Sequence, residues 1–430
     1  MRNYLGKGKF IFGIIPKDIF LWLLIPIEIL FLVFCAYLGK IKKKISTQSN
    51  DKKVILGSVP LTNNVYWRDS IRKFTKAYTF TSSLYKIHNR EDWDFISSEK
   101  FKKLPNRIKE VISVCEALIF YDVIVCSYEG FFLNAKKYWK IQATIFRLSG
   151  IKTIIIPYGS DAYDYSTVSS PLLLTGLMAS YGENAKKRRE IRARIDYWNR
   201  YGDVVIPGFM GFDGLGRWEI LTCSPLVIDT EFWSPHIKKK ELINENNPSI
   251  IIGHYPNHPT FKGTDILIAA VNLLQNEGYR VELKIIEGKS KYEIRHFLQK
   301  EIDILFDQIY FTGYGLTALE GMACGLPVIG NLSNSIYTES FVLNSFLSEC
   351  PIVSASPWNL VDKLKILINS SELRENLGKK GREYVENYHS LEAGTHMFKK
   401  IFEHLFDNKE LPIYLYKPDL LEILNKRDLL

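Results

Sequence analysis

The sequence has few of the residues that build covalent staples and metal sites. Its 430 residues include six cysteines, no two of them in a CxxC pair, and its eight histidines form no HExxH motif. These spacings exclude the usual zinc and dithiol sites, so we expect no protein-bound metal and no cofactor. Cys115 and Cys126 lie in apolar runs, where a free thiol packs as a small core residue, and this usage is typical of a reducing cytosol.

Glycine and proline are not abundant either, and long apolar runs are missing with one exception. The 27 glycines and 17 prolines exclude a fibrous or low-complexity protein. A mean hydropathy of −0.07 excludes a polytopic membrane protein. The 56 Lys and Arg outnumber the 47 Asp and Glu, which gives a net charge of +9. The length suits about two or three globular domains.

The exception is the apolar run from Ile19 to Leu38. As a helix it would reach about 30 Å, the thickness of a bilayer's hydrocarbon core. Pro26 and Glu28 interrupt it, and a carboxylate at mid-bilayer costs about 2.5–3.5 kcal/mol. We expect a membrane element over residues 19–38, either spanning or re-entrant. A buried helix of the globule is the alternative, and a cleaved signal peptide is disfavoured because no AxA-like site follows.

Basic residues flank this run on both sides in equal number. They are Arg2, Lys7, Lys9 and Lys17 before it, and Lys40, Lys42, Lys43 and Lys44 after it. The positive-inside rule therefore gives no orientation by count alone. The tight lysine cluster and the free thiols favour a globule on the cytoplasmic side of the cell membrane, with residues 1–52 as its membrane segment and linker.

The rest of the chain alternates short β-branched runs with helical patterns. Strands are predicted at Val54–Gly57, Asp122–Cys126, Thr153–Ile156 and Val204–Ile206, and again at Ser249–Gly253 and Val281–Ile286. Continuous apolar strands between helices indicate parallel sheets buried on both faces. The economical reading is an α/β chain with two doubly wound domains, residues 53–235 and 246–390. Ligands of such sheets bind beyond the carboxyl ends of the strands.

Two loops of the second domain suit a phosphate ligand. In the first, Gly313 and Gly315 lie between a strand and a helix, and Glu320 follows inside that helix. Glycines let a ligand approach the backbone, and a helix N-terminus offers free N–H groups. In the second, Lys262 precedes Gly263 and a helix, and His254 and His258 lie upstream. The alternative for each residue is that it binds no ligand. Glu320 would then be a solvated side chain, Lys262 an ordinary loop lysine, and the histidines would be hydrogen-bonded within the protein.

These two motifs, in this order, resemble those of the retaining group 1 (family four) GT-B glycosyltransferases, over roughly residues 53–406. Lys262-Gly263 matches the first family motif, and Gly315, Glu320, Gly325 and Pro327 match the second. The resemblance implies two Rossmann-like domains that face a cleft. It also implies that the C-terminal helices of residues 391–430 return to the first domain.

The resemblance also implies roles for these residues. Lys262 would neutralise the donor diphosphate as it leaves, and Glu320 would hold the nucleotide ribose. The other donor-binding residues would be His254, His258, Thr312, Gly313, Tyr314, Gly315, Leu316 and Thr317. The sequence departs from the family twice: Thr312 stands where the first glutamate of the motif belongs, and no arginine precedes Lys262. A histidine is expected to replace that arginine in part.

The acceptor side of the predicted cleft is less sharply marked. The polar residues at the ends of the first domain's strands are Ser58, Asn63, Asn64, Glu129, Ser160 and Asp161. Asp161 is a candidate catalytic acid or base, and Glu129 is a second one. The alternative for each is a turn or capping acid.

The sequence therefore predicts a membrane-associated glycosyltransferase. It would move a sugar from a nucleotide-diphosphate donor to a glycan or lipid-linked acceptor of a surface polysaccharide. A GT-B nucleotide-sugar epimerase, a catalytically silent GT-B subunit and a basic lipid- or nucleic-acid-binding module are the alternatives. No nucleic-acid partner is expected, because no recognition motif accompanies the basic residues of 186–194.

Overall fold

The computed structural model describes residues 17–45, 51–86, 88–236, 249–411 and 413–416, with side chains from residue 23 onward. Arg2, Lys7 and Lys9 lie outside the described residues. So do most of the predicted boundary between the domains and the last part of the expected C-terminal helices, residues 417–430.

The first domain is built on a six-stranded parallel sheet of order β3-β2-β1-β4-β5-β6. Val54 of the central strand lies opposite Ala77 on one side and Val123 on the other. The strands are β1 Lys53–Ser58, β2 Lys76–Thr81, β3 Phe95–Ile96, β4 Val123–Cys126, β5 Lys152–Ile155 and β6 Val204–Val205. The helices are α2 Thr62–Arg72, α3 Ser97–Lys100, α4 Asn106–Phe120, α5 Gln142–Ser149, α6 Pro171–Lys186 and α7 Arg188–Tyr201.

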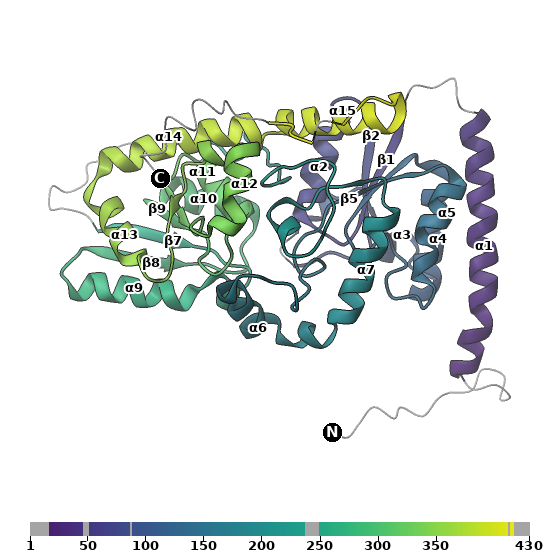
Figure 1. Cartoon of the computed structure of the whole chain (residues 1–430), viewed down its shortest axis with the longest axis horizontal. Coiled ribbons are helices and arrows are strands. Elements are labelled where there is room, and N and C mark those ends of the chain that lie inside the picture. Colours follow the sequence, from purple (N-terminus) through teal and green to yellow (C-terminus); the bar gives the residue numbers. More distant parts are fainter. Residues whose placement is uncertain (1–16, 46–50, 87, 237–248, 412, 417–430) are drawn as a thin grey trace.

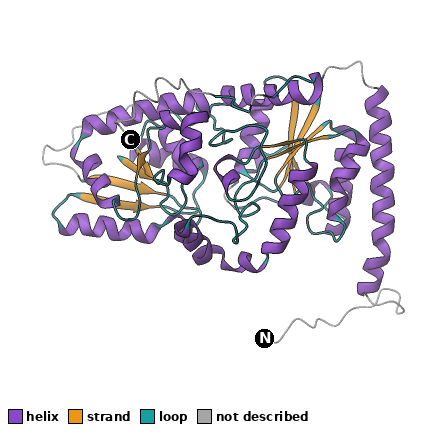
Figure 2. Ribbon diagram, in the orientation of Figure 1, coloured by secondary structure: helices purple, strands orange, loops and turns teal. Residues whose placement is uncertain are grey.

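The second domain has a five-stranded parallel sheet of order β11-β10-β9-β7-β8. Its strands are β7 Ile250–His254, β8 Val281–Ile285, β9 Ile304–Phe306, β10 Val328–Gly330 and β11 Val353–Ser354. Its helices are α8 Pro259–Lys262, α9 Thr264–Asn276, α10 Lys291–Lys300, α11 Leu316–Ala323, α12 Ser335–Asn344, α13 Leu360–Asn369 and α14 Ser371–Tyr388. Figure 2 shows the two sheets apart, each covered by helices.

The pattern of continuous apolar runs found β1, β4, β5 and β6 of the first sheet and β7 and β8 of the second, but it missed β2 and the edge strands β3 and β11. All four residues of β4 are buried, as expected for a strand covered on both faces. β2 was not predicted, because its sequence KAYTFT mixes polar and aromatic residues. α5 begins at Gln142, after a short 3-10 turn at Trp139–Ile141.

The last helix, α15 Leu391–Asp407, leaves the second domain and lies against α2 of the first (Figure 1). The Thr395 hydroxyl donates to the Ser70 carbonyl over 2.8 Å, and Phe402 meets Phe74 edge to face at 5.2 Å between ring centroids. A Cβ at Gly394 would come within 2.5 Å of the Ser70 hydroxyl, so the two helices approach closely only because this residue is glycine.

The N-terminal apolar run forms one helix, α1 Lys17–Ile45, which continues through Pro26. It lies alongside α4 and α5 on the outside of the first domain (Figure 1). Leu32, Cys35 and Ala36 are buried against these helices. The structure therefore shows an unbroken helix half-packed on the globule, where the sequence predicted a spanning or re-entrant element with a buried helix as the alternative.

Candidate active site

The two phosphate-suited loops meet at the carboxyl edge of the second sheet. One loop follows β7 and leads into α8 and α9, and the other follows β9 and leads into α11. β7 and β9 are hydrogen-bonded neighbours in the sheet. Since parallel strands end at the same edge, the lysine of the first loop and the glycines of the second lie side by side.

Lys262 is held in place by a left-handed glycine. Gly263 has a φ of 79°, and a Cβ there would lie 2.3 Å from the Ile309 Cγ2 atom. Only 9% of Lys262 is exposed. Its Nζ atom donates to Asp307 Oδ1 at 2.8 Å and to Gln308 Oε1 at 2.7 Å.

Asp307 was missed by the sequence reasoning, although it lies at the centre of this site. It directly follows β9 and is 1% exposed. One carboxylate oxygen accepts from Lys262, and the other accepts from the Gly315 N–H at 3.2 Å, just before α11 begins. The carboxylate therefore already binds an ammonium group and a helix N-terminal amide. These are the two kinds of group that bind phosphates in other proteins. An acid directly after a buried strand was the available signal.

The glycine-rich turn passes close to the lysine. Gly313 has a φ of 137°, and a Cβ there would lie 2.7 Å from the ring of Phe311. A Cβ at Gly315 would lie 3.7 Å from Lys262 Nζ. Leu316 and Thr317 form the first turn of α11 and are partly exposed. This edge therefore combines a cation with the first N–H groups of a helix.

Glu320 lies one turn further along α11 and is almost buried, with 9% exposed. The Tyr255 hydroxyl, just after β7, donates to its Oε2 atom at 2.7 Å. Burial raises the pKa of Glu320 to about 7 in spite of this hydrogen bond. The side chain can therefore both donate and accept hydrogen bonds near neutral pH, which suits the hydroxyls of a sugar.

Two predicted donor-binding residues have side chains that lie in the interior. His254 is fully buried; its Nδ1 lies 3.0 Å from the Phe306 carbonyl and its Nε2 lies 2.8 Å from the Thr264 hydroxyl. Burial lowers the pKa of His254 to about 4, so it carries no charge that could replace the missing arginine. The side chain of Tyr314 also points inward, and its hydroxyl lies 2.7 Å from that of Tyr384.

Thr312 and His258 take different positions around the site. Thr312, which replaces the expected glutamate, is only 3% exposed. His258 is exposed and meets Tyr181 of α6 edge to face at 5.1 Å between ring centroids. Burial and the charge of Lys262 both lower the pKa of His258. His258 thus lies where the second domain faces α6 of the first.

Asp161 holds two loops of the first domain together. It is 6% exposed and accepts hydrogen bonds from the backbone N–H groups of Tyr128 at 2.9 Å, Tyr158 at 3.0 Å and Gly159 at 3.1 Å. Burial raises the pKa of its carboxyl to about 6, although these three bonds oppose the shift. The side chain is committed to the loops after β4 and β5, which gives it an organising role, and its catalytic role stays a prediction.

The other acceptor-side residues gather around the same sheet edge. Glu129 is partly exposed and accepts from the Tyr158 hydroxyl at 2.9 Å and from Asn134 Nδ2 at 2.8 Å. Internal bonds engage Ser58 with the Phe132 N–H, Asn63 with the Val227 N–H and Asn64 with the Val59 carbonyl. Ser160 is exposed. Glu129 is thus the accessible acid on this side.

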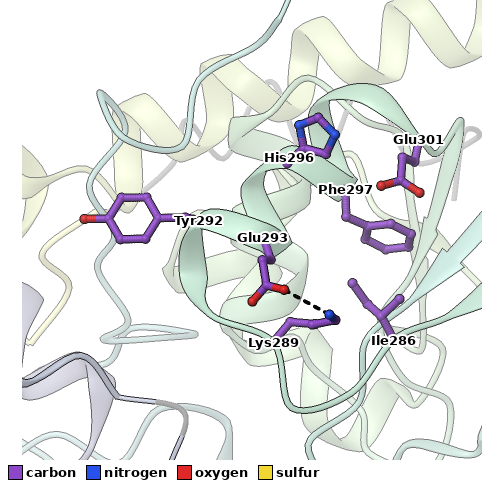
Figure 3. A pocket seen from close by; sticks show the side chains of 7 residues that line it. All are labelled: Ile286, Lys289, Tyr292, Glu293, His296, Phe297 and Glu301. Atoms are coloured by element: carbon purple, nitrogen blue, oxygen red, sulfur yellow. Dashed lines mark hydrogen bonds and ion pairs between the residues drawn. The ribbon is translucent and has the colours of Figure 1, made fainter.

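A cavity of about 410 Å³ lies away from these loops, along α10 (Figure 3). Lys289 and Glu293 face each other in it and form an ion pair of 2.9 Å. None of the predicted site residues lines this cavity, and its lysine is already paired. Within the described ranges, no three His, Cys, Asp or Glu side chains are grouped so that they could hold a metal ion.

The part of the chain that contains this site is similar to known proteins. A family model described as glycosyl transferases group 1 matches residues 235–384. An uncharacterized glycosyltransferase of Methanocaldococcus jannaschii is 30% identical over an alignment of 200 residues, which covers 40% of this chain and 52% of that protein. The match thus spans about half the length of this relative.

The fold itself has a counterpart among solved structures. A sucrose-phosphate synthase of Thermosynechococcus elongatus superposes with a TM-score of 0.56 and 14% identity, covering 84% of this chain and 100% of that one. The prediction of a GT-B fold with two parallel α/β domains is therefore confirmed.

Proposed function

We propose that the protein is a glycosyltransferase that uses a nucleotide-diphosphate sugar. The match of residues 235–384 to group 1 glycosyltransferases supports the reaction class. The observation that carries the proposal is the meeting of Lys262, the Gly315 amide and Glu320 at one sheet edge. A cation and a helix start suit the diphosphate, and a buried carboxyl one turn further suits a ribose.

In this proposal the diphosphate is stabilised as it leaves. The bond between the anomeric carbon and the phosphate oxygen breaks, and the electron pair stays on the nucleoside diphosphate. Lys262 and the first amides of α11 then face the growing negative charge, and such preorganised groups lower the barrier. The acceptor hydroxyl forms the new bond and loses its proton, for which the accessible carboxylate of Glu129 is the candidate base. We propose retention of configuration by analogy with the family.

Asp307 gives Lys262 a counter-ion before any ligand binds. The ammonium has three N–H bonds, and the structure assigns partners to two of them. A diphosphate would therefore use the remaining N–H or displace the carboxylate from Lys262 and Gly315. Asp307 also brings a carboxylate to the donor side, where the family glutamate is replaced by Thr312.

The acceptor is proposed to be a lipid-linked glycan at the cytoplasmic face of the cell membrane. The apolar helix α1 supports this, because it is long and apolar enough for a membrane. Hexose transfer to a surface polysaccharide intermediate is the finer form of the proposal. Neither a metal nor another cofactor is assigned a role.

Incubation of the full chain with a panel of nucleotide sugars and a membrane lipid extract tests the function. A labelled sugar should move from one donor into the lipid fraction, with release of nucleoside diphosphate. The matched variant is Glu129→Gln, which should bind the donor as before but transfer slowly. A donor converted to its epimer without acceptor would indicate the epimerase, and binding without turnover would indicate the silent subunit.

A further inference from the structure

Helix α1 has an outer face that no other described part of the chain covers. Large apolar side chains recur there every three or four residues, the spacing of one helix face. They are 40% to 68% exposed and include Leu30, Phe31, Phe34, Tyr37, Leu38 and Ile41. Phe120, at the end of the neighbouring helix α4, is 47% exposed, and Lys42 Nζ lies 3.8 Å from the centroid of its ring. We call this the α1 face.

Two polar clasps fix the inner side of α1 to the first domain. Near the middle of the helix, Glu28 accepts from Arg107 Nε and from the Tyr138 hydroxyl, both at 2.5 Å. Near its end, Lys43 Nζ donates to the Leu118 carbonyl at 2.9 Å and to the Ser149 hydroxyl at 2.8 Å.

Close packing joins the two clasps. Leu32 and Ala36 are fully buried between them, and Cys35 is 3% exposed. A Cβ at Gly39 would lie 2.0 Å from the Leu118 carbonyl oxygen, so the helix approaches α4 at backbone distance. Detaching α1 would separate the half-buried carboxylate of Glu28 from its partners and would uncover apolar residues of α4.

This attachment is incompatible with a helix that spans a bilayer. The segment between the clasps, Glu28 to Lys43, occupies about 22 Å of the helix axis at 1.5 Å per residue. Only residues 19–27 of the apolar run lie beyond it, about 13 Å, whereas a hydrocarbon core is about 30 Å thick. A spanning α1 would have to carry α4 and α5, with their charged residues, into the lipid.

We propose that α1 lies in the plane of an anionic membrane surface, with the α1 face in the lipid and the first domain on top. Lysines at the C-terminal end of the helix provide the charge complementarity. By helix periodicity Lys42 borders the α1 face on one side, and Lys40 and Lys44 border it on the other, all three exposed. Apolar residues with basic flanks are the composition of interfacial helices.

In-plane docking holds the first domain against the membrane through α1, α4 and α5. It rests on the membrane association in the proposed function, and it is independent of which sugar is transferred. The lipid contact therefore can be tested without any turnover.

Flotation of the full chain with preformed vesicles tests the lipid contact. The protein should float with vesicles of phosphatidylcholine and phosphatidylglycerol, and less with phosphatidylcholine alone. The Leu30→Glu/Phe34→Glu variant should lose flotation, and Lys40→Gln/Lys44→Gln should weaken binding to the anionic vesicles about fivefold per lysine. Leu273→Glu, at an exposed apolar position on α9, is the control away from the α1 face and should float as the wild type does.

Protease digestion of an N-terminal tag distinguishes the orientation. In-plane docking predicts that the tag stays digestible on intact vesicles, and a protected tag would mean a span and overturn the proposal. A dimer without vesicles that Leu30→Glu/Phe34→Glu converts to a monomer would assign the α1 face to a second copy instead. Nucleoside diphosphate affinity measured on the same variants should be unchanged, which separates this proposal from the catalytic one.

Discussion

At the residue scale, the site consists of polar groups that are satisfied by one another before a ligand arrives. Lys262 is paired with Asp307, and Glu320 is hydrogen-bonded to Tyr255. Breaking such a buried pair on one side leaves an uncompensated charge, which costs more than the pair itself contributes. Single substitutions here therefore change stability as well as binding.

Lys262→Ala is expected to lower the free energy of unfolding by about 3–5 kcal/mol, because the carboxylate of Asp307 would remain buried without its cation. Adding Asp307→Asn should restore most of the loss, since the amide is neutral. Urea denaturation of the two single variants and the double variant measures this coupling. Additive effects in that cycle would mean that the two side chains do not interact in solution.

Glu320→Gln is expected to change how stability depends on pH. Since burial raises the pKa of Glu320 from 4.5 to about 7, the folded protein holds this proton more tightly than the unfolded chain does. Its contribution to stability is complete below pH 4.5 and is lost as the pH rises through 7, on the order of 3 kcal/mol. Glutamine does not titrate, so the stability difference between the variant and the wild type should change across this window. A constant difference would show that the carboxyl has an ordinary pKa.

At the element scale, the site is formed by the two segments in which a strand leads through a loop into a helix. These segments were the most predictable part of the site. β7, β9 and α11 followed from apolar runs and glycine punctuation, so the placement of Lys262, Gly315 and Glu320 at one edge could be expected. The partner of Lys262 could not, because Asp307 lies 45 positions away and its contact depends on strand order. The burial of the His254 and Tyr314 side chains could not be predicted either, since the sequence does not show in which direction a loop side chain points.

The joint between α8 and α9 depends on a left-handed glycine. Gly263→Ala should destabilise the protein by more than about 1 kcal/mol and displace Lys262, because its Cβ would meet Ile309 at 2.3 Å. Gly278→Ala is the control: its φ of 89° is equally unsuited to alanine, but nothing lies within 4 Å of its Cβ. Thermal unfolding should show a larger loss of stability for Gly263→Ala than for Gly278→Ala. Equal losses of stability would mean that backbone strain alone, without the contact to Ile309, causes the destabilisation.

At the scale of the whole molecule, two sheets present their carboxyl edges to each other and α15 ties the domains together. The GT-B architecture was predictable, because alternating strands and helices repeat twice and the motifs of the second half are specific. The position of α1 was not, since an apolar run of 20 residues reads the same whether it crosses a membrane or lies on a domain. The clasps of Glu28 and Lys43 make that distinction, and their partners are far away in the sequence.

The central claim is that the edge around Lys262 and Gly315 binds a nucleoside diphosphate. Calorimetric titration of the full chain with a panel of nucleoside diphosphates tests it most directly, using Lys262→Gln/Asp307→Asn as the comparison because it removes both charges together. The account predicts that at least one nucleoside diphosphate binds the wild type and that the double variant binds it about 10- to 150-fold more weakly, the loss of a charge-assisted contact of about 1.5–3 kcal/mol. Equal affinities, or no binding of any nucleoside diphosphate to the wild type, would contradict it.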